Sequence, residues 1–283
     1  MQRATNGSVA LAYERAGPST AGSEAVVFIA GLGYGQWMWR WQQAALEDEY
    51  PTLVWNNRGT ALSDTPEGPY TIADMAADLE AVLSDAGVER AHLVGASMGG
   101  MIAQHYALEY DRAKTLSLLC ATPGGANAKP VPDSTKQALG SIPDDIDPRE
   151  EIKRRMAPAV SGTFFKDDPD RLESIIDWRL EQDADATGRM AQAQGVIAFD
   201  VADRLEEIEL PVLVLHGEAD EVVPVENGRL LAAGLPNATL ETCPEGHHLF
   251  FIEEAPWVND RLRRFLEDHV TASTSATSTE SDT

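Results

Sequence analysis

Short apolar runs recur along most of the chain, separated by longer stretches of mixed polarity. The runs are Ser8–Tyr13, Ala25–Ala30, Thr52–Trp55, Ala91–Ala96, Thr115–Ala121, Pro211–His216 and Thr239–Cys243. From the third run onward they consist largely of Val, Leu and Ala without polar alternation. That pattern is typical of strands buried on both faces of a parallel sheet.

Amphipathic stretches with a helical period separate these runs. The clearest is Thr71–Ala86, which places Ile72, Met75, Ala76, Leu79, Val82 and Leu83 on one stripe and is followed by Gly87 as a stop. Others are Met98–Tyr110, Val225–Ala233 and Pro256–His269. Strands that alternate with helices predict a doubly wound, mostly parallel α/β sheet.

The pattern changes between residues 122 and 205. Strand-like runs vanish there, and helical stretches at Pro148–Met156 and Pro169–Gln182 each begin after an Asp that can cap them. We therefore expect an α/β core made of residues 1–121 and 206–270, with residues 122–205 inserted as a helical cap. Residues 271–283 are nearly all Ser, Thr and Ala, a composition that predicts a disordered tail.

The chain is strongly acidic. Its 283 residues include 46 Asp and Glu but 22 Lys and Arg, a formal net charge of −24, and 17 of the 22 basic residues are Arg. No third of the chain is basic, so we expect no nucleic-acid or membrane partner and a small molecule as the substrate. An acidic, Lys-poor surface resembles the proteins of extreme halophiles, where molar salt screens self-repulsion. We therefore expect a halophilic protein.

The sequence also indicates the cellular compartment of the protein. Cys120 and Cys243 lie far apart in apolar surroundings, which favours buried thiols in a reducing cytosol over a disulfide or a metal site. The first residues lack the apolar segment of a signal peptide. The longest nearly apolar stretch, residues 25–35, is shorter than the ~20 residues that span a bilayer. We expect a soluble cytoplasmic protein that binds no metal.

The segment Gly95-Ala96-Ser97-Met98-Gly99 fits the pattern G-x-S-x-G. An apolar run leads into it and an amphipathic helix follows. A strand, a sharp turn and a helix are what a nucleophile elbow requires, because the glycines let the backbone take a strained turn that exposes the serine hydroxyl. Ser97 is therefore the predicted nucleophile. The plainer alternative is a glycine-rich helix start without catalysis.

A serine hydroxyl needs a base, because it is a weak nucleophile at neutral pH. The chain has six histidines, at positions 92, 105, 216, 247, 248 and 269. His247 follows the turn Pro244-Glu245-Gly246, so its loop can reach the carboxyl edge of the sheet, where the sites of open α/β folds collect. We predict His247 as the base, with His248 as the alternative.

The base in turn needs an acid that holds its imidazole in the right tautomer. The loop after the run Pro211–His216 carries three carboxylates, those of Glu218, Asp220 and Glu221. The loop after the preceding run, residues 121–124, carries none. The acid is therefore expected in the later loop, where the residues themselves leave both Glu218 and Asp220 open.

An oxyanion hole requires two backbone N–H groups aimed at the developing negative charge. One is expected at Met98, directly after the nucleophile, and the other in the glycine-rich loop Gly31-Leu32-Gly33-Tyr34-Gly35. The alternative reading of this loop is a phosphate cradle. A P-loop would need Lys followed by Ser or Thr where Gln36-Trp37 stands, and a dinucleotide fingerprint would need Gly at Gln36. We therefore expect no cofactor.

Taken together, these motifs resemble those of the α/β-hydrolase fold family, in particular its cap-bearing esterases, enol-lactonases and haloperoxidase-like enzymes. The resemblance rests on Gly31–Gly33, Asn57–Thr60, Ser63-Asp64, Gly95–Gln104, Leu215–Asp220, Gly246-His247 and the Pro256 helix. It implies a triad of Ser97, Asp220 and His247. It also implies an oxyanion hole from the N–H groups of Leu32 and Met98.

Two further consequences follow from the resemblance. Arg58 and Asp64 look like the family's structural loop pair. Ala30 stands where the family most often has His, and Asn57 replaces a common Asp. Because the oxyanion donor is a backbone N–H, the first departure implies altered loop support and not lost activity.

The function that this reading favours is hydrolysis of a carboxylic ester or lactone through an acyl-enzyme. The alternatives are a C–C bond hydrolase, a perhydrolase or haloperoxidase-like enzyme or an acyltransferase with the same triad, and then a ligand-binding protein without catalysis. The cap is expected to shape substrate choice over a largely apolar acyl pocket. Its large apolar residues are expected mainly to pack the cap itself: Met156, Phe164, Phe165, Trp178, Met190 and Phe199.

Overall fold

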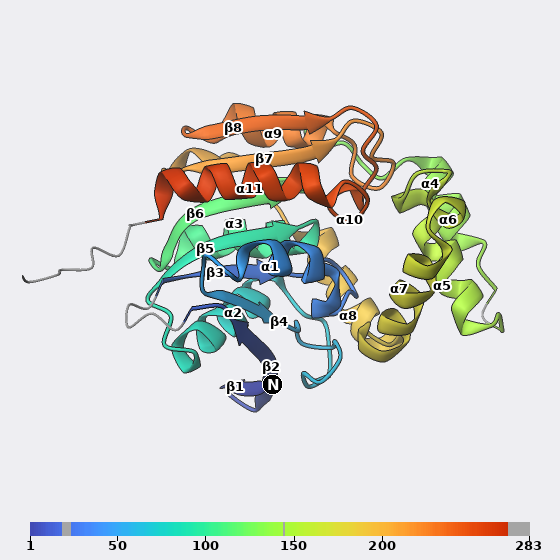
Figure 1. Ribbon diagram of the computed structural model, residues 1–283, viewed down its shortest axis with the longest axis horizontal. Helices are drawn as coiled ribbons and strands as arrows, with labels where there is room; N and C mark the ends of the chain where they lie inside the picture. The colour runs from blue at the N-terminus through green and yellow to red at the C-terminus, as the bar shows by residue number, and fades with distance from the viewer. Residues whose placement is uncertain (19–23, 144, 271–283) are drawn as a thin grey trace, which may run out of the picture.

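An eight-stranded sheet forms the centre of the computed structural model, which describes residues 1–18, 24–143 and 145–270 (Figure 1). The strand order is β1-β2-β4-β3-β5-β6-β7-β8. The strands are β1 Gln2–Asn6, β2 Val9–Ala16, β3 Glu24–Ile29, β4 Thr52–Trp55, β5 Arg90–Ala96, β6 Ala113–Leu119, β7 Val212–Gly217 and β8 Ala238–Cys243. β2 runs antiparallel to β1 and β4, and the other neighbours are parallel. The predicted α/β class is confirmed. The predicted tail lies outside the described residues.

Helices cover both faces of this sheet. On one face lie the 3₁₀ turn η1 Gln36–Trp39, α1 Arg40–Leu46, α10 Phe250–Glu253 and α11 Ala255–His269; on the other lie α2 Ile72–Asp85, α3 Met98–Glu109, the 3₁₀ turn η3 Ala202–Glu207 and α9 Glu226–Gly234. Figure 1 shows α1 and α11 side by side in front of the strands, with α2, α3 and α9 behind them. None of the described helices is long and apolar enough to cross a membrane.

The two layers bury different sides of the same strands. In β3, Val27 and Ile29 join the core under α2 and α3, whereas Val26 and Phe28 join the core under α1 and α11. All four side chains are at most 1% exposed. A strand with both faces buried needs apolar residues at every position, which explains why these runs show no polar alternation.

Several described elements are not among those that the sequence predicts, and β1 and α8 show why. β1 is an edge strand in which only Ala4 is buried, so it has almost no apolar pattern. The helix α8, Ala186–Ala198, buries small or polar residues, Gly188, Ala191, Gln192 and Gly195. A helix that packs through small residues approaches its neighbour closely but carries little hydrophobic periodicity.

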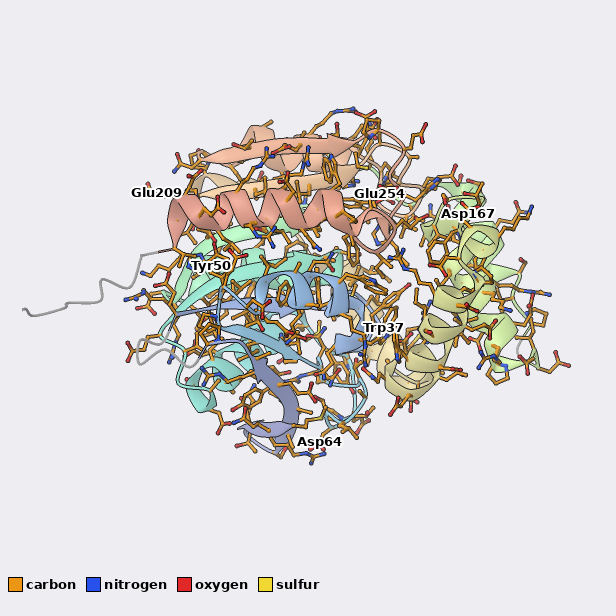
Figure 2. The ribbon with its side chains drawn as sticks, in the orientation of Figure 1. Trp37, Tyr50, Asp64, Asp167, Glu209 and Glu254 are labelled. Carbon is orange, nitrogen blue, oxygen red and sulfur yellow. The ribbon has the colours of Figure 1, made fainter. Side chains whose placement is uncertain are left out.

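Among the described residues, five helices and one 3₁₀ turn lie between β6 and β7 in sequence. They are α4 Asp133–Gly140, α5 Pro148–Met156, η2 Ala157–Ala159, α6 Phe164–Asp167, α7 Pro169–Gln182 and α8. We call helices α4 to α8 the cap. Figure 1 shows them gathered beyond the carboxyl ends of the parallel strands. Figure 2 shows Trp37 where the sheet layer meets the cap, and its ring lies 6.1 Å from that of Trp178 in α7. The cap therefore faces the edge of the sheet where sites of this fold class form.

Candidate active site

Ser97 sits in a strained turn between β5 and α3. Its φ is 54° and its ψ is −116°, a backbone conformation that residues other than glycine rarely adopt. The turn also needs its flanking glycines: a Cβ on Gly95 would lie 2.3 Å from the oxygen of Gly99, and a Cβ on Gly99 would lie 2.0 Å from the oxygen of Ile29. The conformation is that of the nucleophile elbow that the sequence predicts.

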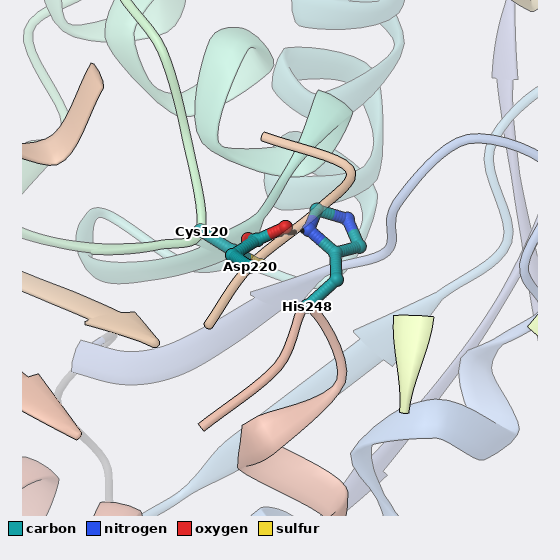
Figure 3. A group of neighbouring side chains, drawn as sticks. All are labelled: Cys120, Asp220 and His248. Carbon is teal, nitrogen blue, oxygen red and sulfur yellow. Dashed lines mark hydrogen bonds and ion pairs between the residues drawn. The ribbon is translucent and has the colours of Figure 1, made fainter. Parts of the chain in front are cut away.

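The histidine that pairs with Asp220 is His248. Its Nδ1 lies 2.8 Å from Asp220 Oδ2, and both side chains are buried. An ionised carboxylate only accepts, so Nδ1–H donates and Nε2 is left for other chemistry. The sequence prediction of His247 is wrong on this pairing: His247 is half-buried and makes no bond to Asp220. Figure 3 shows the imidazole of His248 directed at the carboxylate.

Both carboxylate oxygens of Asp220 accept hydrogen bonds. Its Oδ1 accepts the backbone N–H groups of Val222 and Val223, each at 2.8 Å, and Nε2 of His216 lies 3.5 Å from Oδ2. Burial raises the pKa of Asp220, but His248 and His216 lower it more, so it stays below the usual range. Glu218, the other candidate, accepts a hydrogen bond from Thr242 at the surface.

The same pair shifts the pKa of His248. Burial lowers it, but the negative charge of Asp220 raises it more, and the balance is a pKa well above 6.5. An imidazole beside a buried carboxylate is therefore a stronger base than a free one. It also has a fixed tautomer, because Nδ1 must keep its proton for Asp220.

Cys120 lies beside this pair, directly after β6 (Figure 3). It is fully buried, free and in the left-handed region with a φ of 43°. Burial raises the pKa of the thiol, and the nearby His248 and the backbone of Ser97 lower it less. Cys120, Asp220 and His248 (Figure 3) bring metal-binding atoms within 4.8 Å of one another. Asp220 and His248 already satisfy each other, so we read the cluster as the floor of the site.

The oxyanion loop, residues 31–35, is held in place by the cap. The N–H of Gly33 donates to Gln192 Oε1 at 2.7 Å, while Nε2 of the same amide donates to the oxygen of Arg58 at 2.8 Å. Ala184 N–H donates to the oxygen of Gly33 at 2.9 Å. In the described chain neither Leu32 nor Met98 donates its N–H to a protein group. Both predicted oxyanion donors are thus free to serve a ligand.

A cavity of about 290 Å³ joins these parts. Its wall includes Gly31, Leu32, Ser97 and His248, with Phe251 among the apolar side chains of the sheet layer. None of the six large apolar cap residues singled out by sequence lines it, and all but Met190 pack in or against the hydrophobic core. Met190 is 66% exposed. The wall is mostly apolar, as expected, but three cap arginines also reach it.

Arg58 and Asp64 do not form a side-chain pair. Arg58 binds the buried carboxylate of Asp78 through two bonds of 2.6 and 2.7 Å, and Asp64 accepts the N–H of Ala10. Figure 2 shows Asp64 at the lower edge of the molecule, near β1 and β2. Both residues thus fix loops, with Asp78 as the partner that the sequence does not reveal.

Sequence reasoning also missed Gln192 and the cap arginines. A signal for Gln192 exists: it stands among Gly188, Ala191 and Gly195, so the small residues mark a close helix contact on its side. A Cβ on Gly188 would lie 2.3 Å from the oxygen of Gly59. No comparable signal marks the arginines, because arginine is the commonest basic residue throughout the chain.

Comparison with known proteins places this geometry in a family. The model of the alpha/beta hydrolase fold matches residues 24–255. The chain is 30% identical over 267 residues to RutD of Caulobacter segnis, a provisionally assigned carbamate hydrolase, covering 93% of this chain and 99% of that one. It is 28% identical over 262 residues to 3-oxoadipate enol-lactonase 2 of Acinetobacter baylyi, covering 92% and 94%.

The fold is also that of a solved enzyme. The crystal structure of an enol-lactonase from Burkholderia xenovorans superimposes with a TM-score of 0.82 at 23% identity, covering 94% of this chain and 100% of the other. An esterase from Exiguobacterium antarcticum superimposes with a TM-score of 0.79 at 22% identity, covering 92% and 96%. The chain therefore belongs to the α/β-hydrolase fold family and is a hydrolase of that family.

Proposed function

We propose that this enzyme cleaves a carboxylic ester or lactone with Ser97 as nucleophile, His248 as base and Asp220 as the acid that orients the base. The observation that carries the proposal is the meeting of three features on one cavity: the strained turn of Ser97, the Asp220–His248 pair and the free N–H groups of the oxyanion loop. These are the parts that acyl transfer through serine requires.

The reaction begins when Ser97 Oγ attacks the carbonyl carbon and His248 Nε2 takes the serine proton. Asp220 stabilises the resulting imidazolium through Nδ1. The tetrahedral intermediate collapses, the C–O bond to the alcohol breaks, and the alcohol leaves with the proton from His248. Water then attacks the acyl-enzyme, His248 takes the water's proton, and Ser97 recovers it when the acid is released.

The negative charge of each tetrahedral intermediate rests on the N–H groups of Leu32 and Met98. The second of these lies at the start of α3, where the helix dipole also favours an anion. Removing one such donor costs about 10²- to 10³-fold in kcat in comparable enzymes. The loop that carries Leu32 must therefore stay in one position, which is what its bonds to the cap provide.

Two further properties complete the proposal. Both cysteines are buried and free, which supports a reducing, cytoplasmic setting. The net charge of −24 supports adaptation to high salt. Neither property bears on the chemistry at Ser97.

The experiment is hydrolysis of a panel of methyl esters, p-nitrophenyl esters and lactones by the wild type and by Ser97→Ala. We expect the substitution to lower kcat by about five to six orders of magnitude. Ser141→Ala, at an exposed cap position outside the cavity, is the matched control and should keep wild-type rates. Ester hydrolysis that survives in purified Ser97→Ala would overturn the assignment.

A further inference from the structure

Three arginines of the cap meet at the cavity that holds Ser97. Arg155 comes from α5, Arg179 from α7 and Arg189 from α8. Among the described residues that line this cavity there is no Asp or Glu. In a chain with a net charge of −24, such a gathering of positive charge at the reaction centre is unexpected.

The carboxylates nearby neutralise two of the three charges. Glu151 binds Arg155 at 2.7 Å, and Asp183 binds Nε of Arg179 at 2.7 Å. Arg189 donates to the oxygen of Ala184 at 3.1 Å, and in the described chain no carboxylate lies within ion-pair distance of it. Asp185 caps the start of α8, the helix that carries Arg189, but its carboxylate accepts the N–H of Gly188 and forms no ion pair with Arg189 in the described chain. About one positive charge is left for a ligand.

Arg179 also has a buried donor without a partner. The residue is 4% exposed, its guanidinium carbon lies 4.4 Å from the centre of the Tyr34 ring, and its Nη1 makes no hydrogen bond in the described chain. A buried donor without a protein partner is costly, and Arg179 lines the cavity, so a bound ligand would remove that cost. The unpartnered Nη1 is independent of the charge count and leads to the same expectation.

Arg189 lies against the oxyanion loop. A Cβ on Gly33 would be 3.5 Å from its Cγ and 3.8 Å from its Cζ, so the guanidinium lies close to the residue after Leu32. Burial, and then repulsion from Arg155 and Arg179, lower the pKa of Arg189. An anion placed between these arginines would offset the repulsion and stabilise the charged form of Arg189. It would also share one cavity with Leu32 and Ser97.

We propose that Arg179 and Arg189, supported by Arg155, form a carboxylate-binding subsite, so that the substrates are esters or lactones whose acyl part ends in a carboxylate. This inference rests on the proposed function of the same cavity. The guanidinium fork matches a carboxylate. A carboxylate carries one negative charge, which balances the one uncompensated arginine. A phosphate dianion would carry one negative charge too many. The acyl part stays bound through both half-reactions, so an anchor there acts on both.

The subsite is joined to the oxyanion loop through Asp183. One carboxylate oxygen of Asp183 accepts from Arg179, and the other accepts the N–H of Gly35 at 3.2 Å and Nε1 of Trp37 at 2.8 Å. Replacing Arg179 would leave a buried carboxylate unpaired and disturb the loop. Arg189 pairs with no carboxylate in the described chain and donates only to the oxygen of Ala184, so its replacement leaves no buried charge unpaired and it is the better residue to change.

The test compares two substrates that differ by one charge, monomethyl glutarate and dimethyl glutarate. The wild type is expected to prefer the charged monoester by about ten- to a hundred-fold in kcat/KM. Arg189→Met should lower that ratio by at least ten-fold, mainly through KM. Arg154→Met removes an exposed arginine of α5 that does not line the cavity, and it should leave the ratio at its wild-type value.

Binding provides a readout that does not need turnover. Calorimetry with glutarate on Ser97→Ala should give saturable binding that weakens about ten-fold or more when Arg189→Met is added. Loss of hydrolysis in Ser97→Ala alone tests the proposed function. A wild type that hydrolyses both esters through Ser97 without preference, or glutarate binding that ignores Arg189→Met, would overturn the subsite and leave the proposed function standing. An equal fall in kcat on both esters would also overturn it, because Arg189 would then act on the oxyanion.

Discussion

Gln192, in the cap helix α8, accepts the N–H of Gly33 in the oxyanion loop at 2.7 Å. The same amide donates to the oxygen of Arg58 and to the hydroxyl of Thr60, so one fully buried side chain joins the cap to two loops of the core. The cap therefore both covers the cavity and fixes the loop that carries Leu32. Under the proposed mechanism Gln192 would be a positioning residue, because it would act through that loop.

Gln192→Ala should lower kcat by about ten- to a hundred-fold while changing KM little. The substitution leaves the N–H of Gly33 without its acceptor, and a displacement of an oxyanion donor by about 1 Å costs rate in this range. Gln194→Ala, at an exposed position of the same helix, is the control and should behave as the wild type. Circular dichroism and thermal unfolding establish that both variants fold. A rise of about ten- to a hundred-fold in KM with unchanged kcat would contradict the positioning role.

The pH profile of kcat/KM should have its acid limb above pH 6.5. His248 acts as a base only when neutral, and Asp220 raises its pKa well above 6.5, so activity falls as the pH drops through that raised value. Asp220→Asn removes the charge that raises the pKa. It should move the acid limb to lower pH and reduce kcat by about 10⁴-fold through loss of the correct tautomer. An acid limb that stays in place in Asp220→Asn would show that another group titrates.

The two thiols should resist modification in the native enzyme. Cys120 is 0% exposed and Cys243 is 7% exposed, and burial raises the pKa of each, so little thiolate is available. Ellman's reagent should modify neither thiol in the folded protein and both thiols in denaturant. Rapid labelling of Cys120 in the folded protein would mean that the floor of the site opens.

Salt should stabilise the protein. With 46 acidic and 22 basic residues, self-repulsion destabilises the folded state, and raising KCl from about 0.1 M to about 2 M screens it. The unfolding temperature from differential scanning calorimetry should rise over that range. A sucrose series at matched osmolality separates screening from exclusion of the solute from the surface. An unfolding temperature that stays level in KCl would refute the halophilic assignment.

The residues that sequence located best are those whose position depends on local pattern. The strand before Ser97, the glycines around it and the helix after it all belong to one continuous stretch, so their arrangement follows from periodicity and turn chemistry. The loop after the buried strand β7 is located in the same way, but its pattern leaves both Glu218 and Asp220 open, and it is the resemblance to the family that implies Asp220. The helix bounds Pro148–Met156 and Pro169–Gln182 agree with the structure because an Asp caps each first turn.

The residues that sequence misplaced depend on contacts between distant segments. His247 and His248 are neighbours in a loop without periodicity, and the choice between them is made by the position of Asp220. A Cβ on Gly217 would lie 2.1 Å from the oxygen of Gly246, so close packing of these two loops sets which histidine faces inward. Gln192 and Arg189 likewise gain their roles only when α8 packs on the core.

The measurement that tests the central claim most directly is labelling by a fluorophosphonate, read by mass spectrometry. The wild type should gain one adduct, on the peptide that contains Ser97, and Ser97→Ala should gain none. His248→Ala should slow labelling by about three orders of magnitude or more, because the serine loses its base, whereas His247→Ala should label at close to the wild-type rate. Fast labelling of His248→Ala together with slow labelling of His247→Ala would contradict the account.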